Sequence, residues 1–369
     1  MPALGVLHID TMKGWRGGER QACYLAEGLH ELGCRVGFAC KPASETALRL
    51  QKSVVALHPT VFRFEADFSA AWHIAGLIRK YKYDILHMHD SHAHWLGGCA
   101  AIIAGRPLRI VSRRVDFSIN RHGFGLSIIK YRHFADAFIA VSNAVKKALV
   151  KDGVPEGMVH VIHSGVKINR KGIGTERSEL NKILGTNGTS RIVGAVGSLV
   201  GHKGHSILVE AASQVARKIP EARFVVLGEG VLRPKLESQV KRAGLSGKFF
   251  LPGHVNDASR LLGGFDVLVM PSIMEGLGTS ALDAMSAGVP VIATDAGGLS
   301  EVVTNRKTGL LAESGDPGSL ASAIVNMLGE RTLGVGLALN AKKRVAEKFC
   351  VERMVDRTYK LYVKLLSGR

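Results

Sequence analysis

Residues 271–298 read PSIMEGLGTSALDAMSAGVPVIATDAGG, and they decide the fold of the chain. The stretch follows an apolar run and carries Glu275 into a turn rich in glycine. A short helix is predicted to begin at Thr279 or Ser280, and a buried strand follows from Val289. A strand, a turn, a helix and another strand are typical of a parallel sheet, whose carboxyl edge binds ligands in α/β proteins.

The turn and its helix offer two kinds of group to a ligand. Glu275 can accept hydrogen bonds from sugar hydroxyls, and the first amides of the helix can bind phosphate. The combination suits a sugar attached to a nucleoside diphosphate. Two alternatives remain open. In the first, Glu275 is a solvated loop residue that binds no ligand. In the second, Ser280 and Asp283 form a capping box that satisfies backbone donors without a ligand.

Short apolar runs alternate with helical patterns along the chain, which predicts an α/β protein with parallel sheets. In the first half the predicted strands are Gly5–Asp10, Arg35–Cys40, Val54–His58, Asp84–His89, Arg109–Arg113, Ala137–Val141 and Val159–His163. In the second half they are Arg191–Gly197, Arg223–Gly228, Phe249–Leu251, Asp266–Met270, Val289–Thr294 and Gly309–Ala312.

The segment between the two sets of strands divides the chain. Residues 164–188 are polar, rich in glycine and poor in apolar periodicity. We therefore predict two Rossmann-like parallel-sheet domains that face each other across a cleft, over residues 1–165 and 190–345. A linker region is expected at 166–189 and a terminal helix within 346–369.

Composition limits the class of protein. With 369 residues the chain is long enough for two domains with separate cores. Its five cysteines are odd in number and lack Cys-x-x-Cys spacing, so we expect neither a disulfide framework nor a zinc knuckle. No basic and then apolar segment precedes the first strand, and no apolar run is long enough to cross a bilayer. We therefore expect a cytoplasmic protein.

The net charge of +18 is the strongest global feature. Residues 1–170 hold 23 Lys and Arg against 13 Asp and Glu. This excess favours anionic lipid, acidic glycolipid or nucleic acid as a partner. Nucleic acid is not expected, because aromatic residues are not interleaved with the cations. We expect a peripheral protein at the inner face of the plasma membrane. The alternative is a solvated basic face that only aids solubility.

The stretch 271–298 closely resembles the donor-site motif of the family 4 glycosyltransferases, which are retaining enzymes of the GT-B fold. In that family two acids stand in the pattern Glu-x7-Glu, and here the pattern is Glu275-x7-Asp283. The resemblance implies that Glu275 contacts the donor sugar and that Asp283 contacts the nucleotide ribose. It covers nearly the whole chain, and it implies that the helix within 346–369 crosses back to the first domain.

Other donor-binding residues follow from the same resemblance. Residues 194–205 lead from a strand through a loop to a helix, and Lys203 can stabilise a leaving diphosphate. The family has an arginine where this chain has Ser198, so helix amides or another cation must compensate. An ordinary first-turn lysine is the alternative. The implied donor-binding set is Gly17, Gly18, Lys203, Gly253, Glu275, Gly276, Leu277, Gly278, Thr279 and Asp283.

Glycine pairs mark two further turns. Gly17 and Gly18 follow the first strand, and their amides can approach a phosphate at the start of a helix. They resemble the family's Gly-Gly loop, which closes over the donor phosphate, although a plain turn is the alternative. Residues 228–230 fail the dinucleotide fingerprint and resemble the family's Gly-Glu-Gly turn, which borders the donor pocket.

Four histidines, at positions 87, 89, 92 and 94, follow one predicted strand. Such a cluster can bind a transition metal, but only residues two apart on a strand share a face. The family shows a similar strand without a metal. We therefore predict no metal and regard His89 as an acceptor-side residue.

The acceptor side departs from the family pattern. Many members carry a histidine after the strand that corresponds to residues 109–112, where this chain has Arg113, Arg114 and Asp116. Asp116 is the candidate to receive the proton of the acceptor hydroxyl, and either arginine can hold an anionic acceptor or the donor diphosphate. Alternatively these three residues only pair with one another.

These features predict a retaining glycosyltransferase of the hexosyltransferase type. It would move a hexose from a nucleoside diphosphate sugar to a hydroxyl of a cell-envelope glycan or of a glycolipid like lipopolysaccharide. Glu275, Lys203 and Asp116 are the catalytic candidates, and no cofactor is expected. The rival functions are a nucleotide-sugar epimerase of the same architecture and a binding-only paralogue, which Ser198 and the missing histidine motivate.

Overall fold

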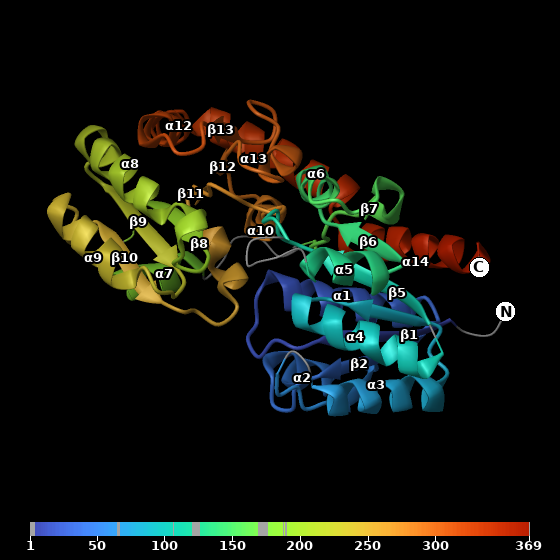
Figure 1. Cartoon of the computed structure of the whole chain (residues 1–369). Coiled ribbons are helices and arrows are strands. Elements are labelled where there is room, and N and C mark those ends of the chain that lie inside the picture. The colour runs from blue at the N-terminus through green and yellow to red at the C-terminus, as the bar shows by residue number, and fades with distance from the viewer. Residues whose placement is uncertain are drawn as a thin grey trace. The chain divides into compact units, whose positions relative to one another are not determined.

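The computed structural model describes residues 4–64, 67–105, 107–119, 126–168, 176–186, 188 and 190–368. The chain forms two compact units, each with a parallel sheet and surrounding helices (Figure 1). Unit 1 is Met1–Gly165 together with Val351–Arg369, and unit 2 is Val166–Cys350. In sequence, unit 2 is therefore inserted into unit 1.

The sheet of unit 1 has the order β3-β2-β1-β4-β5-β6-β7. Its parallel strands confirm the seven predicted from the first half: β1 Gly5–Asp10, β2 Arg35–Cys40, β3 Ala56–Pro59, β4 Ile85–Met88, β5 Leu108–Arg113, β6 Ala137–Ala140 and β7 Val159–Val161. Strand β3 begins at Ala56 and not at Val54, because Ala56 is the first residue with a partner on β2, Gly37.

Helices cover both faces of this sheet: α1 Gly17–Glu31, α2 Glu45–Leu50, α3 Phe68–Tyr81, α4 Ser91–Ala104, α5 Leu126–His133, α6 Asn143–Lys151, the 3₁₀ turn η1 Glu156–Met158 and α14 Val351–Ser367. Alternate residues of β4 face opposite sides. Ile85 shares a buried cluster with residues of α1 and α14, whereas Leu86 and Met88 approach Gly97 of α4. The terminal helix thus completes the core of unit 1.

The sheet of unit 2 has the order β10-β9-β8-β11-β12-β13, also parallel. It confirms the six strands predicted from the second half: β8 Arg191–Val196, β9 Ala222–Leu227, β10 Phe249–Gly253, β11 Val267–Met270, β12 Val291–Thr294 and β13 Leu310–Ala312. The helical segments are α7 Glu176–Leu184, η2 Gly201–Lys203, α8 His205–Lys218, α9 Arg233–Arg242, η3 Ala258–Gly264, α10 Thr279–Ala287, α11 Leu299–Val302, α12 Pro317–Gly329 and α13 Arg331–Lys348.

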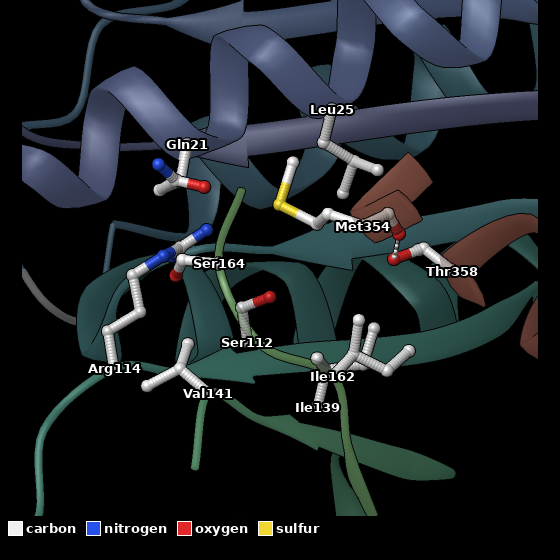
Figure 2. Close-up of a pocket in the computed structure, with 10 residues that line it drawn as sticks. All are labelled: Gln21, Leu25, Ser112, Arg114, Ile139, Val141, Ile162, Ser164, Met354 and Thr358. Atoms are coloured by element: carbon white, nitrogen blue, oxygen red, sulfur yellow. Dashed lines mark hydrogen bonds between the residues drawn. The ribbon is translucent and has the colours of Figure 1, made fainter. Parts of the chain in front are cut away.

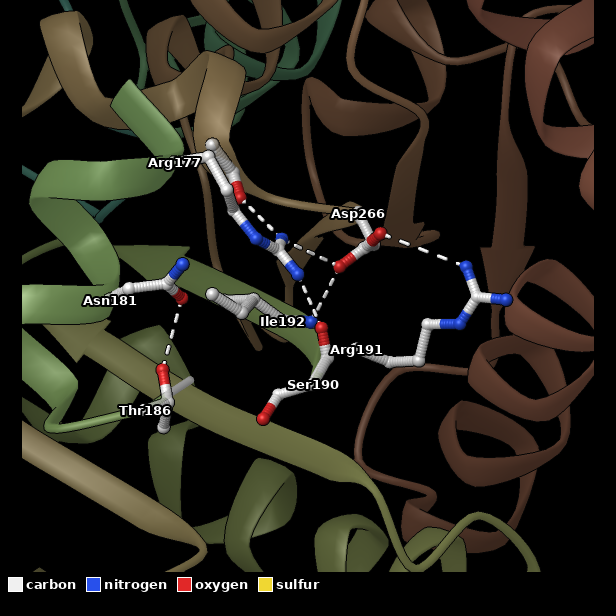
Figure 3. Close-up of polar contacts among 8 residues, drawn as sticks. Arg177, Asn181, Thr186, Ser190, Arg191, Ile192 and Asp266 are labelled. Atoms are coloured by element: carbon white, nitrogen blue, oxygen red, sulfur yellow. Dashed lines mark hydrogen bonds and ion pairs between the residues drawn. The ribbon is translucent and has the colours of Figure 1, made fainter. Parts of the chain in front are cut away.

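Part of the segment predicted as a linker is folded into unit 2. Helix α7 is fastened by Arg177, whose Nη1 donates to Asp266 Oδ2 and to the Gly264 carbonyl, each at 2.8 Å. Asp266 in turn accepts from the amide of Ile192 at 2.6 Å, and Arg177 also donates to the carbonyl of Ser190 (Figure 3). Residues 169–175, 187 and 189 of the predicted linker lie outside the described residues.

Within the part of the chain that the structure describes, none of the helices combines the length and the apolar character that crossing a membrane requires.

Candidate functional site

The sheet of unit 2 has its topological switch point between β8 and β11, where the strand order reverses. The loops after these strands meet there. The carbonyl of His202 accepts from the amides of Ile273 at 2.8 Å and Met274 at 3.3 Å. Gly204 permits this approach, because a Cβ there would lie 1.8 Å from the carbonyl oxygen of Pro271. Open α/β sheets bind ligands at such a point.

The two loops bring together the charged residues predicted for the donor. Nζ of Lys203 donates to Oε2 of Glu275 at 2.5 Å, and Ser272 Oγ donates to the same oxygen at 3.2 Å. The side chain of Glu275 is 13% exposed and that of Lys203 is 22% exposed, so both are shielded but still reachable. A cation for phosphate and a carboxylate for sugar hydroxyls therefore stand side by side.

Two helices begin beside this pair. Helix α8 starts after Gly204 and helix α10 after Gly278, both in the left-handed conformation, with φ of 67° and 90°. Neither has a side-chain cap among the described residues, so the first amides of each helix suit an anion. These amides can compensate for Ser198. His205 cannot, because burial lowers its pKa to about 4 and leaves it neutral at pH 7.

The capping box considered for Ser280 and Asp283 is wrong. The N-cap of α10 is Gly278, whose left-handed backbone conformation starts the helix two residues earlier than the box requires. Both residues therefore lie inside the helix. Asp283 is half-buried in its second turn.

The backbone around Glu275 is fixed by a second glycine turn. The amide of Gly298 donates to the carbonyl of Glu275 at 2.8 Å. A Cβ at Gly298 would lie 2.1 Å from the carbonyl oxygen of Gly276, so only glycine fits. Leu277 is buried, which anchors the turn between Glu275 and the helix.

The Gly-Glu-Gly turn after β9 packs against the loop that carries Lys203. The amide of Leu199 donates to the carbonyl of Glu229 at 3.0 Å, and a Cβ at Gly228 would lie 1.9 Å from the carbonyl oxygen of Gly197. Gly253, at the end of β10, accepts from the Gly228 amide at 2.9 Å. The turn and Gly253 are thus part of the same edge of the sheet.

Gly17 and Gly18 are the first two residues of α1 in unit 1. These two glycines and the loop before them, residues 11–18 together, are called the glycine loop below. Three carboxylates accept hydrogen bonds from its backbone: Asp90 from the amide of Thr11 at 2.7 Å, Asp10 from the amide of Met12 at 2.9 Å, and Glu19 from the amide of Arg16 at 2.7 Å. The loop is therefore held from β1, α1 and the start of α4.

The four predicted histidines separate in the structure. His87 and His89 lie at the end of β4 beside His8 of β1. Nε2 of His92 instead donates to the carbonyl of Phe64 at 2.8 Å, and His94 is buried against the ring of Tyr131.

Nitrogen atoms of His8, His87 and His89 lie within 4.8 Å of one another, close enough to consider a metal. However, His89 Nε2 is 2.8 Å from His8 Nδ1, and His87 is bonded to Tyr362 at 2.5 Å and to Ser112 at 2.8 Å. Burial lowers the pKa of all three rings, so they are neutral at pH 7. Hydrogen bonds explain the cluster without an ion, and the expectation of no metal stays a prediction.

The acceptor-side arginines have separate surroundings. Arg113 donates to the carbonyls of Val115 at 3.1 Å and Phe117 at 2.6 Å, and so shapes the segment that carries Asp116. Arg114 donates from Nη1 to the carbonyl of His89 at 3.0 Å. Neither arginine forms an ion pair with Asp116 among the described residues, so the mutual-pairing alternative is not what holds them. Asp116 is half-buried.

A small cavity lies beside Arg114, between α1, the sheet and α14 (Figure 2). About 20 Å³ is open to the centre of a water molecule, which is room for about one water. Its polar lining includes Gln21, Ser112, Arg114, Ser164 and Thr358. It is too small for a sugar.

Sequence reasoning missed His8, Asp10, Glu19 and Asp90. Asp10 is the last residue of β1, and Asp90 caps α4 two residues after β4. The pairing of β1 with β4 becomes visible only in the sheet order. An acid after each of two apolar runs was the available signal, but it gains meaning only when the strands are known to be adjacent.

Two family models match the chain. One, described as glycosyl transferases group 1, matches residues 176–344, and the other, glycosyltransferase family 4, matches residues 15–170. The chain is 27% identical to the UDP-Gal:alpha-D-GlcNAc-diphosphoundecaprenol alpha-1,3-galactosyltransferase of Escherichia coli, over 99% of this chain and 98% of that protein. It is 26% identical to the capsular polysaccharide biosynthesis glycosyltransferase CapM of Staphylococcus aureus, over 82% and 83%.

Solved structures share the fold. The crystal structure of Anabaena HepE in complex with UDP and glucose has a TM-score of 0.86 and 21% sequence identity to this chain, over 98% of this chain and 100% of that one.

Proposed function

Because this chain belongs to the family 4 glycosyltransferases of the GT-B fold, we propose that it transfers a hexose, with retention, from a nucleoside diphosphate sugar to a cell-envelope glycan or glycolipid. The observation that carries the proposal is the Lys203–Glu275 pair at the switch point of unit 2. It is accompanied by two helix starts that lack side-chain caps among the described residues.

The donor-site residues divide the donor between them. Glu275 binds hydroxyls of the sugar, and Lys203 binds the diphosphate. When the donor enters, its phosphate and hydroxyl groups replace the direct Lys203–Glu275 contact with contacts of the same polarity. Asp283 binds the ribose. Gly17 and Gly18 offer backbone amides to phosphate oxygens.

The reaction needs a stabilised leaving group more than a strong base. The acceptor oxygen attacks the anomeric carbon from the face that the diphosphate leaves, the bond from that carbon to the diphosphate breaks, and the departing oxygen takes the acceptor's proton. Lys203 and the helix amides stabilise the negative charge that develops on the diphosphate. Asp116 assists the proton transfer.

The acceptor is proposed to be a polyprenyl-linked or other membrane glycan. The support is the relative from Escherichia coli, whose name specifies a diphosphoundecaprenol acceptor. The match with that relative covers nearly the full length of both chains. That name also specifies UDP-Gal as donor, so we place uridine diphosphate sugars first among the candidate donors.

An anionic membrane surface is the proposed partner, and α3 is the proposed docking element. Phe64, Phe68 and Trp72 lie before and on α3, and their exposed fractions are 59%, 61% and 62%. Residues 68–83 contain Arg79, two lysines and no acid. The rings lie at the amino end of α3, which Asp67 caps, and the cations lie at its carboxyl end. Exposed aromatic rings and cations on one element are typical of elements that lie in the interface of an anionic bilayer.

A panel of uridine, guanosine and adenosine diphosphate sugars in a thermal-shift assay tests the donor. One base should raise the melting temperature, and a flat response to all of them would contradict the proposal. The binding donor is then incubated with and without a polyprenyl-diphosphate glycan. Transfer should require the acceptor. Isomerised sugar without acceptor would indicate the epimerase, and binding without any turnover would indicate the binding-only paralogue.

A further inference from the structure

We propose that Arg114 is a positioning residue, which holds the glycine loop in place from the end of β5 and does not bind the acceptor or the donor itself. The inference rests on the proposed function, because the use of the loop amides for phosphate belongs to that proposal. Its structural part, that Arg114 fixes the loop, stands on contacts inside unit 1.

The side chain of Arg114 lies beside the start of α1. A Cβ built on Gly18 would lie 3.6 Å from Cδ of Arg114, which is ordinary van der Waals contact. The stem of Arg114 therefore lies against one of the two glycines whose amides begin α1. Figure 2 shows the same side chain extending toward Gln21, in the next turn of that helix.

The guanidinium group of Arg114 is oriented by His89. Nη1 donates to the carbonyl of His89 at 3.0 Å, and Nη2 lies 2.8 Å from His89 Nδ1. Arginine can only donate, so His89 Nδ1 must accept and its proton must sit on Nε2. Nε2 then donates to His8 Nδ1 at 2.8 Å. The hydrogen bond from His89 to His8 therefore fixes the ring that holds the guanidinium group of Arg114.

The positive charge of Arg114 lies near the carboxylates that hold the glycine loop. Asp10, Glu19 and Asp90, the three acids that bind the backbone of the glycine loop, all act electrostatically on Arg114. Three buried or half-buried carboxylates repel one another, and the positive charge of Arg114 near them opposes that repulsion without a direct ion pair among the residues described. Without it, the acids that hold the loop would separate or take up protons, and the loop would lose its anchors.

Arg114 is half-buried, and its guanidinium group is already bonded within unit 1. Burial lowers its pKa from the usual value, although the three acids oppose this effect. Its Nε has no hydrogen-bond partner among the described residues and borders the cavity that has room for about one water. The polar atoms of Arg114 with known surroundings are therefore engaged with His89 or lie beside this small space, which is too small for a glycan or a diphosphate.

The test compares Arg114→Gln with Arg109→Gln in the full chain. Arg109 is the matched control because it lies near the start of β5, the strand that Arg114 follows, and pairs with Asp136 at 2.8 Å. Hydrogen exchange of peptides covering residues 11–20 is the readout. We expect Arg114→Gln to speed exchange in the loop about tenfold or more, while Arg109→Gln leaves it as in the wild type.

A second variant separates positioning from direct binding. In Arg114→Gln/Asp10→Asn one carboxylate is neutral, so we expect slow loop exchange and most of the lost kcat/KM to return. Anionic and neutral acceptors should lose kcat/KM by the same factor in Arg114→Gln.

Wild-type exchange in Arg114→Gln would overturn the proposal. So would a rise in KM confined to anionic acceptors that Asp10→Asn does not repair, because it would show direct binding. If Arg114→Gln does not fold, Arg114→Lys retains the charge but not both bonds to His89, and it should show a smaller increase in loop exchange. The exchange readout needs no sugar transfer, so failure of the proposed function would not be mistaken for failure of this inference.

Discussion

Glu275 combines two demands at the scale of one residue, a charge that must be shielded and a carboxylate that must reach a ligand. We expect Glu275→Ala to abolish transfer while the protein stays folded. The stability change should be small, at most about 1 kcal/mol, because the freed Lys203 ammonium can be solvated. Initial rates and thermal melts check this.

Ser272→Ala is the companion variant, since it removes only one hydrogen bond to the same carboxylate oxygen. It should reduce transfer far less than Glu275→Ala. Wild-type turnover in Glu275→Ala would remove that residue from the site.

Asp10 gives the second prediction at this scale. Burial and the neighbouring Asp90 and Glu19 raise its pKa from 3.8 to about 7, although Arg114 and the Met12 amide oppose this. Between these values the folded protein binds a proton that the unfolded chain has released. The contribution of Asp10 to stability therefore falls as the pH rises through this window and stays low above it.

Asp10→Asn removes this effect, and its amide oxygen can still accept from Met12. Compared with the wild type, it should gain stability from about pH 5 to about pH 8. Urea unfolding at both values, followed by hydrogen exchange in β1, measures the difference. An unchanged difference between the two values would show that Asp10 ionises normally in the folded state.

At the scale of elements, glycine decides which loops meet. Gly204 has a φ of 67°, and a Cβ there would lie 1.8 Å from the Pro271 carbonyl oxygen. We expect Gly204→Ala to push the β8–α8 and β11–α10 loops apart, to weaken donor binding and to destabilise unit 2 by more than about 1 kcal/mol. Gly201→Ala is the control, because nothing lies within 4 Å of its Cβ position. Equal donor affinity in both variants would contradict the prediction.

The α3 surface gives a prediction for a whole helix. Phe68→Ser/Trp72→Ser should weaken sedimentation with phosphatidylglycerol vesicles, because two rings no longer enter the interface. In the wild type, brominated lipid should quench the fluorescence of Trp72, and salt should weaken binding. Val231→Ser/Leu339→Ser is the control, since these residues are also exposed, by 85% and 66%, but lie on unit 2. If both double variants bind equally, α3 is not the docking element.

Elements were easier to predict from the sequence than the contacts between them. The apolar runs predicted the thirteen strands found in the described residues, and the glycines around residues 278–288 predicted helix α10. The observed strand ends differ from the predicted ones because pairing with the neighbouring strand sets them, as at Ala56, the first residue of β3 that pairs with β2. Helix α7 was missed because only Leu180 and Leu184 are buried among its residues, and its hold on the sheet is polar, through Arg177.

The candidate site was predictable only in part for the same reason. Lys203 and Glu275 belong to local motifs, and a resemblance to a family was enough to single them out. The acids around Arg114 come from β1, α1 and α4, and no local pattern unites them. Their meeting depends on the order of the strands.

At the scale of the whole molecule, the last helix belongs to the first unit. Tyr362 is fully buried and bonded to His87, and Val355 fills the space over Gly28 of α1. Removal of Val351–Arg369 should therefore lower hydrogen-exchange protection in β1 and leave β8 protected. Equal loss in both strands would show that the helix supports the chain as one cooperative body.

The two ends of unit 2 lie next to each other. Val166 pairs with Cys350 in a parallel bridge, and its amide donates to the carbonyl of Phe349 at 2.8 Å. A domain whose two ends are adjacent can be replaced as a unit, because only the two chain junctions to the other domain have to be rebuilt. Residues 166–350 of a relative with another nucleotide preference can be grafted between Gly165 and Val351. We expect the chimaera to keep its acceptor and to use the donor sugar of the relative.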